Sequence, residues 1–143
     1  MKNAIHILFL SFALISSAHA ADPREQMNEA VAKAGNPPDM DEIARNPSIV
    51  ANQKLYFGMV ALEAQDGAYI RTVANWLTRK RGERIQYVYI KFTKGTHMLA
   101  EPKFGQAARL LGRYVDNVQY SVRGGGVMTA PLVEVTYIQP YQP

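Results

Sequence analysis

The first twenty residues constrain this chain most, because they decide how much of it is left to fold. Met1 to Asn3 form a short positive start, Ala4 to Ile15 is an almost unbroken apolar stretch, and Ala18-His19-Ala20 supplies small residues before Ala21. This three-part pattern is typical of a cleavable secretory signal. The apolar stretch is shorter than the roughly 20 residues that span a bilayer. We therefore predict a signal peptide over residues 1–20 and a protein that is periplasmic or secreted.

Removal of that signal leaves 123 of the 143 residues, a length that suits one domain with a real core. The chain has no cysteine, so neither disulfide bonds nor thiolate metal ligands contribute to its stability. No second apolar stretch approaches the length of a membrane span, so we expect no transmembrane segment after signal cleavage. The stability must come from packing.

Residues 21–53 are predicted to be a helical or linker segment. Glu25 to Ala34 suits a short helix, with Pro23 near its start and Gly35 just past its end. A second helical turn is expected from Asp39 to Arg45. Large apolar residues are sparse here, so a packed segment and a flexible linker are both consistent with the composition.

Residues 54–143 are expected to form a single α/β domain. From Lys54, apolar residues alternate with the period of a strand, although Gly58 interrupts them. Between Tyr69 and Lys80 apolar residues recur every three or four positions, which predicts an amphipathic helix. Arg84 to Phe92 is rich in β-branched and aromatic residues and is apolar on both faces, which predicts an interior strand.

The second half of this domain repeats the alternation. A helical stripe runs from Phe104 to Val115, and two strands follow at Val118–Arg123 and Leu132–Ile138, joined by a flexible turn at Gly124–Gly126. The order is strand, helix, strand, helix, strand, strand. It predicts an α+β fold: a two-layer α/β sandwich with a four-stranded mixed sheet, two helices on one face and a short helical N-terminal segment.

This order resembles the OmpA-like peptidoglycan-associating domain, in which a Leu- and Ala-rich second helix runs into a strand that ends like Arg123-Gly124-Gly125-Gly126. The resemblance implies a peptidoglycan-associated role. The family carries an Asp after a Thr and an Arg on the second helix, which hold the peptidoglycan stem peptide. Here Lys94 follows Thr93, and Ala107 stands at the Arg position. The resemblance therefore implies a member that has lost or replaced the peptidoglycan site.

Catalytic and metal sites are hard to build from the residues present. His97 is the only histidine after residue 20, and the two serines there, Ser48 and Ser121, lie outside any Gly-x-Ser-x-Gly motif. A zinc site needs several ligands at defined spacing. We expect no metal and no cofactor. Glu63 and Asp66 are interpreted as caps of the helix predicted from Tyr69 rather than as a catalytic carboxylate pair.

Basic residues gather in the second half of the chain. From Gly67 onward there are eleven bases and four acids. The best binding candidate combines four bases within six positions with two tyrosines: Arg79, Lys80, Arg81, Arg84, Tyr87 and Tyr89. Arginine binds phosphate and carboxylate in a forked geometry, and tyrosine stacks on sugar rings. This pattern predicts a surface for an anion, a glycan or a partner; the alternative is a solvated helix end.

These observations favour an exported, periplasmic, non-enzymatic binding or scaffold module, an accessory component of a cell-envelope or secretion assembly. Its expected partner is an envelope protein or a cell-wall polymer, and export argues against nucleic acid. One alternative is a cell-wall (peptidoglycan or polysaccharide) enzyme that uses Glu63, Glu101 or Asp116 in a cleft. Another is a secreted inhibitor of such an enzyme.

Overall fold

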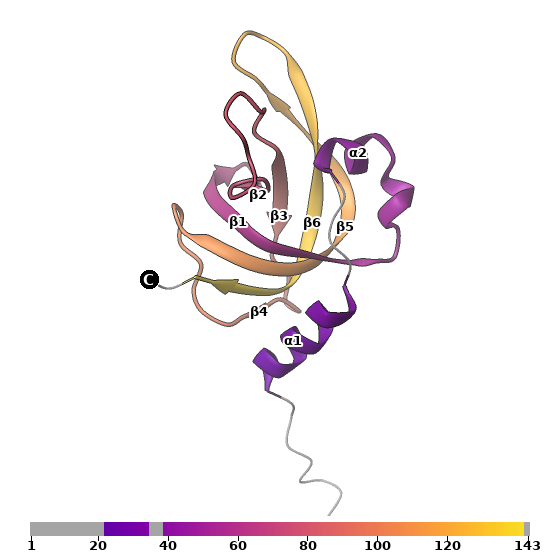
Figure 1. Ribbon diagram of the computed structural model, residues 1–143, viewed down its shortest axis with the longest axis vertical. Coiled ribbons are helices and arrows are strands. Elements are labelled where there is room, and N and C mark those ends of the chain that lie inside the picture. Colours follow the sequence, from indigo (N-terminus) through magenta and orange to yellow (C-terminus); the bar gives the residue numbers. More distant parts are fainter. Residues whose placement is uncertain (1–21, 35–38, 142–143) are drawn as a thin grey trace, which may run out of the picture.

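The computed structural model describes residues 22–34 and 39–141, most of which belong to one six-stranded mixed sheet (Figure 1). Three short helices precede the sheet: α1 (Pro23–Lys33), α2 (Met40–Arg45) and the 3-10 helix η1 (Pro47–Val50). The strands are β1 (Lys54–Asp66), β2 (Tyr69–Val73), β3 (Tyr87–Lys91), β4 (His97–Met98), β5 (Ala107–Ser121) and β6 (Val127–Pro140).

The predicted signal peptide, residues 1–20, lies outside the described residues. Within the described part of the chain, none of the helices has the length and apolar character needed to cross a membrane.

The sheet closes on itself. Its strand order is β3-β2-β1-β5-β6-β4, and β3 also pairs in parallel with β6, for example between Ile90 and Val133. Five strands therefore form a small barrel, and β4 pairs with a later stretch of β6. Closure satisfies the backbone hydrogen-bonding groups that an open sheet would leave at its edges.

Bulges and glycines bend the strands enough for closure. The first half of β1 pairs with β5 and its second half with β2, and the register with β5 shifts between Phe57 and Val60, beside Gly58. In β5 the register with β6 shifts at Gly112, where a Cβ atom would lie 2.5 Å from the backbone oxygen of Glu134. Only glycine fits this close approach, because a β-bulge brings the two backbones together there.

The interior of the barrel is filled by apolar side chains from its strands, and α2 and η1 close one end with Met40, Ile43 and Val50. Thr72 is also fully buried, and its hydroxyl donates to the backbone oxygen of Val88 at 2.9 Å. The strand side chains of this core are Leu55, Phe57, Val60, Leu62, Val88, Ile90, Ala108, Leu110, Val133, Val135 and Ile138.

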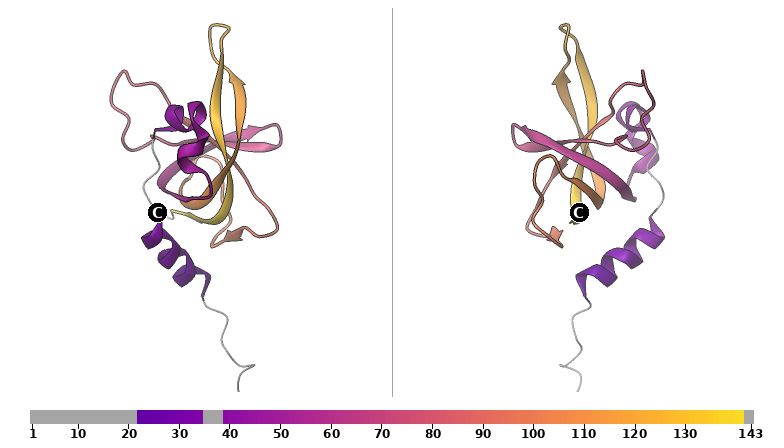
Figure 2. Two further views of the ribbon diagram at one scale, coloured as in Figure 1. Left: turned by 90° about the vertical axis from the view of Figure 1, so that its right-hand side faces the viewer. Right: turned by 60° about the vertical axis from the view of Figure 1, so that its left-hand side comes forward.

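Helix α1 packs on the outside of the sheet (Figure 2). Its Met27 is completely buried against Leu111 of β5 and Tyr137 of β6. The side chain of Asp22 caps the helix by accepting a hydrogen bond from the backbone N–H of Arg24 at 2.9 Å. The described residues of the N-terminal segment are thus packed on the sheet rather than extended away from it.

The predicted two-layer α/β sandwich is wrong, because the protein is mostly β and has no helix layer on its sheet in the described residues. The helix predicted at Tyr69–Lys80 is β2 followed by a turn-rich connection, and the helix predicted at Phe104–Val115 is largely β5. In β5, the shift at Gly112 breaks the alternation of apolar residues and imitates a helical period. Pairing with two neighbouring strands outweighs the helix propensity of Ala and Leu.

Other local predictions are confirmed. The interior strand expected at Arg84–Phe92 is β3, which pairs with β2 on one side and β6 on the other. The turn expected at Gly124–Gly126 connects β5 to β6, and the backbone N–H of Val122 donates to the carbonyl of Gly126 at 2.9 Å. The strands expected at Val118–Arg123 and Leu132–Ile138 overlap the long hairpin that β5 and β6 form.

Candidate binding surface

The six predicted site residues lie on one continuous stretch of structure but in different surroundings. The four bases belong to the connection between β2 and β3, residues 74–86, which we call the β2–β3 connection. Tyr87 and Tyr89 follow it on the outer face of β3, opposite the interior residues Val88 and Ile90. Tyr87 is half-buried and Tyr89 is completely buried. Tyr89 therefore has no exposed ring on which a sugar stacks.

The β2–β3 connection is held in shape by its own polar groups. The side-chain amide of Asn75 donates to the backbone oxygen of Arg84 at 3.0 Å and accepts from the N–H of Gln86 at 2.9 Å. A Glu83 carboxylate oxygen accepts from the backbone N–H of Lys80 at 2.9 Å. These bonds tie the start of the connection to its end. Figure 2 (left) shows the connection projecting from the side of the sheet.

Arg79, Lys80 and Arg81, which we call the free bases, are exposed. Their side chains form no ion pair or hydrogen bond with any residue that the structure describes. Each charged group is therefore open to solvent and to an external anion. Three adjacent cations on a projecting loop create a local positive potential that attracts phosphate and carboxylate groups.

Arg84 differs from the free bases because it has partners within the protein. Its guanidinium forms an ion pair with Asp41 of α2, and its second terminal nitrogen lies 2.7 Å from the sulfur of Met128 on β6. Nearby, the side-chain amide of Gln86 donates to Asp39, the residue that caps α2. Arg84 thus holds α2 against β3 and the β5–β6 hairpin, and its charge is already neutralised.

The outer face of β2 and β3 carries a group that we call the tyrosine cluster: Arg71, Tyr87, Tyr89 and Tyr120. The ring of Tyr120, from β5, meets that of Tyr87 edge to face at 5.2 Å between centroids. The guanidinium of Arg71 lies over the ring of Tyr87 at 5.2 Å. The hydrophobic surroundings of the cluster include Ala130 and Leu132 of β6, so the β5–β6 hairpin covers much of this face.

Two carboxylates complete the tyrosine cluster. Glu63 accepts a hydrogen bond from Arg71 at 2.6 Å, and Asp66 accepts one from the hydroxyl of Tyr89 at 2.7 Å. Burial, and then the hydrogen bond to Asp66, raise the pKa of Tyr89 well above its ordinary value, so this hydroxyl stays protonated. Sequence reasoning missed Arg71 and interpreted both carboxylates as helix caps, which is wrong because a strand follows them.

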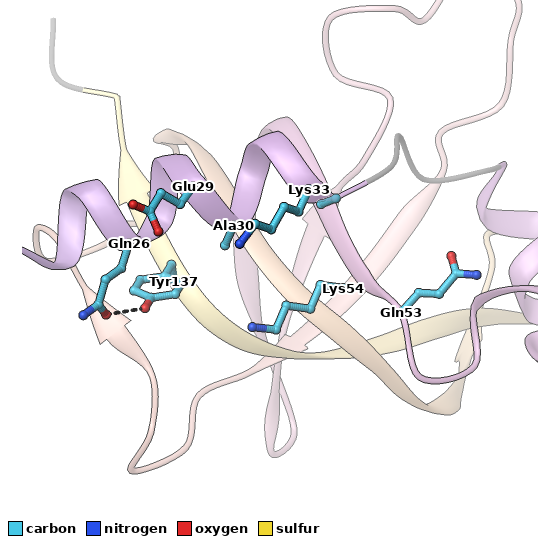
Figure 3. Close-up of a pocket in the computed structure, with 8 residues that line it drawn as sticks. Gln26, Glu29, Ala30, Lys33, Gln53, Lys54 and Tyr137 are labelled. Atoms are coloured by element: carbon cyan, nitrogen blue, oxygen red, sulfur yellow. Dashed lines mark hydrogen bonds between the residues drawn. The ribbon is translucent and has the colours of Figure 1, made fainter. Parts of the chain in front are cut away.

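A groove lies between α1 and the sheet on another side of the molecule (Figure 3). It has a volume of about 590 Å³, and its charged lining residues are Glu29, Lys33 and Lys54. Figure 3 shows the hydroxyl of Tyr137 bonded to the side chain of Gln26, at 2.8 Å. This bond fastens α1 to β6. The mixed charges of the lining give the groove no preference for an anion or a cation.

The carboxylates considered for catalysis do not come together. Glu63 is engaged by Arg71, while Glu101 and Asp116 are exposed, and none of the three lines the groove beside α1. His97 lies on β4, where its ring stacks on that of Tyr137 at 4.9 Å between centroids. Among the described residues there is no group of three or more His, Asp or Glu side chains placed to hold a metal ion.

Comparison of the chain with models of protein families, with curated proteins and with solved structures finds no match. The binding surface is therefore interpreted from its own residues.

Proposed function

We propose that this protein is an exported, non-enzymatic binding module of the cell envelope that holds an anionic partner through the β2–β3 connection. The observation that carries the proposal is the group of three free bases, which are adjacent, exposed and without partners among the described residues. The connection has four bases and one acid, and only Arg84 among the bases is neutralised within the protein.

Two further features support this proposal. The hydrogen bonds of Asn75 and Glu83 shape the connection before any partner arrives, which lowers the entropy lost on binding. Small five-stranded barrels, of which the OB fold is an example, commonly bind ligands on the face of their second and third strands and the loops beside it. That second point is an analogy of architecture and suggests a location rather than a ligand.

The envelope location rests on the N-terminal sequence, whose pattern predicts export, and it remains part of the proposal. The chemistry common to the expected partners is a surface rich in phosphate or carboxylate groups, and the free bases bind such groups by hydrogen bonds assisted by charge. The proposal does not depend on the OmpA-like resemblance.

Co-sedimentation with isolated envelope material, washed sacculi and membranes in separate tubes, tests the proposal. The test variant is Arg79→Ala/Lys80→Ala/Arg81→Ala. The matched control is Lys94→Ala/Lys103→Ala/Arg123→Ala, which removes the same charge from three other exposed positions. We expect the wild type and the control to pellet with at least one fraction and the test variant to lose at least about tenfold in affinity.

Salt gives the second arm of the experiment. Binding by exposed charges weakens as ionic strength rises, because the Debye length falls from about 10 Å at 0.1 M to about 3 Å at 1 M. We expect wild-type binding to decrease accordingly. Equal pelleting by the wild type and the test variant, or no pelleting with either fraction at low salt, would refute the proposed function.

A further inference from the structure

Two large apolar side chains are exposed on the β2–β3 connection itself. Trp76 and Leu77 are 56% and 66% exposed, and they precede the free bases by only a few residues. Asn75, directly before them, forms the hydrogen bonds that shape the connection, so its structure does not bury them. Water contact with this much apolar surface is unfavourable, at about 25 cal/mol per Å² of surface left unburied.

The apolar surface continues from Leu77 back to the sheet. Leu77 borders a shallow hollow of about 330 Å³ whose other lining residues include Phe57 and Met59 of β1 and Tyr141. Tyr141 is itself 43% exposed, and its hydroxyl donates to the backbone oxygen of Gly58 at 2.9 Å. The exposed leucine is thus part of an apolar patch, with the free bases a few residues along the chain.

This combination matches the chemistry of a membrane surface better than that of a wall polymer. A glycan stacks on aromatic rings but gives an exposed leucine little to gain, whereas the acyl boundary of a bilayer accepts both leucine and tryptophan. Tryptophan favours the depth of the lipid headgroups, and bases beside it meet anionic phosphates. A projecting connection also suits a flat bilayer, while glycan and other small-molecule sites are concave.

We propose that the β2–β3 connection docks on an anionic lipid surface, with Arg79, Lys80 and Arg81 on the phosphates and with Trp76 and Leu77 buried at the headgroup boundary. This inference rests on the proposed function and names the anionic partner. Each base near an anionic surface contributes about fivefold to affinity, so the three together contribute about a hundredfold. Binding is peripheral, because only the connection enters the lipid.

The chain offers a built-in reporter, since Trp76 is its only tryptophan. The protein is purified after export, and mass spectrometry determines the N-terminus that all variants share. It is then titrated with large vesicles of phosphatidylglycerol and phosphatidylcholine in equal parts, or of phosphatidylcholine alone. We expect the anionic vesicles to shift the emission of Trp76 to the blue and to shield it from an aqueous quencher. Neutral vesicles leave both unchanged at low lipid concentration.

Variants separate the two components of docking. Arg79→Ala/Lys80→Ala/Arg81→Ala is expected to weaken binding to anionic vesicles about a hundredfold, and Leu77→Ala about fivefold with the reporter retained. The control Lys94→Ala/Lys103→Ala/Arg123→Ala keeps its affinity within about threefold. Near-ultraviolet circular dichroism checks that each variant has the tertiary packing of the wild type.

The outcomes distinguish this inference from the proposed function. An unchanged Trp76 emission and no pelleting with anionic vesicles, together with binding to sacculi that depends on the bases, overturns the lipid inference and leaves the proposed function standing. Binding to vesicles without a change at Trp76 also overturns it, because the contact then lies elsewhere. Failure of the triple variant to weaken binding to any envelope fraction defeats both.

Discussion

The tyrosine cluster and the β2–β3 connection use the same residue types in opposite ways. In the cluster, Tyr89 is buried and bonded to Asp66, and Arg71 is bonded to Glu63. In the connection, the free bases lack partners among the described residues, and Trp76 is more than half exposed. Aromatic and basic side chains stabilise the fold where their partners are built in. Where none are, the same groups are available to an external partner.

The largest effect expected from this difference is on stability. Replacement of Tyr89 by Ala removes a completely buried ring and leaves a cavity beneath the β5–β6 hairpin, so we expect a loss of about 3 to 5 kcal/mol in the free energy of unfolding. Urea denaturation followed by circular dichroism measures it. A loss below about 1 kcal/mol would mean that Tyr89 is not part of a packed cluster and would remove half of the comparison.

A smaller effect isolates the hydroxyl of Tyr89. Tyr89→Phe keeps the ring and removes the hydrogen bond to Asp66, a carboxylate whose side chain is 47% exposed and can turn to water. We expect a loss of about 1 kcal/mol at neutral pH. Full stability of this variant at neutral pH would show that the bond contributes nothing.

The raised pKa of Tyr89 makes this contribution depend on pH. An ordinary tyrosine, as in the unfolded chain, loses its proton near pH 10.0, whereas the folded protein retains this one to higher pH. Above pH 10 the unfolded state therefore binds fewer protons than the folded state, and stability falls as pH rises. We expect the wild type to lose its advantage over Tyr89→Phe between pH 10 and the higher folded pKa. A constant difference across that range would contradict the assignment.

Arg84 tests the boundary between the two regions. Arg84→Ala breaks the ion pair with Asp41, but the two side chains are 41% and 39% exposed, so water screens the pair strongly. We expect a loss of stability below about 1 kcal/mol and a smaller loss of envelope binding than Arg81→Ala causes. If Arg84→Ala weakens binding as much as Arg81→Ala does, Arg84 belongs with the free bases.

The smallest effect on stability is expected for the free bases. Because these side chains form no ion pair or hydrogen bond with the described residues, Arg79→Ala/Lys80→Ala/Arg81→Ala is expected to change the free energy of unfolding by no more than about 0.5 kcal/mol. The same urea measurement checks it. Clear destabilisation would show that these bases also support the fold and would weaken the contrast with the tyrosine cluster.

Local patterns predicted some elements of this fold and failed for others, for a consistent reason. Residues 87–91 are apolar on both faces, and such a stretch is stable only as a strand with covered faces, so β3 was predictable. The segment that begins at Tyr69 has apolar residues at helical spacing, but Ile70, Thr72 and Val73 favour strands equally. Pairing with β1 and β3 decided between the two, and neither partner is visible in the segment itself.

The candidate surface divides in the same way. That bases and aromatic residues gather between Trp76 and Tyr89 is a property of the amino-acid sequence alone, as are the absence of cysteine and the export pattern of the first twenty residues. Tertiary structure decided which of them are available. Arg84 meets Asp41, 43 residues earlier, and Tyr89 is covered by Leu132, whereas the connection projects away from both. Partners so distant in the chain are chosen by closure of the sheet, and local periodicity carries no information about closure.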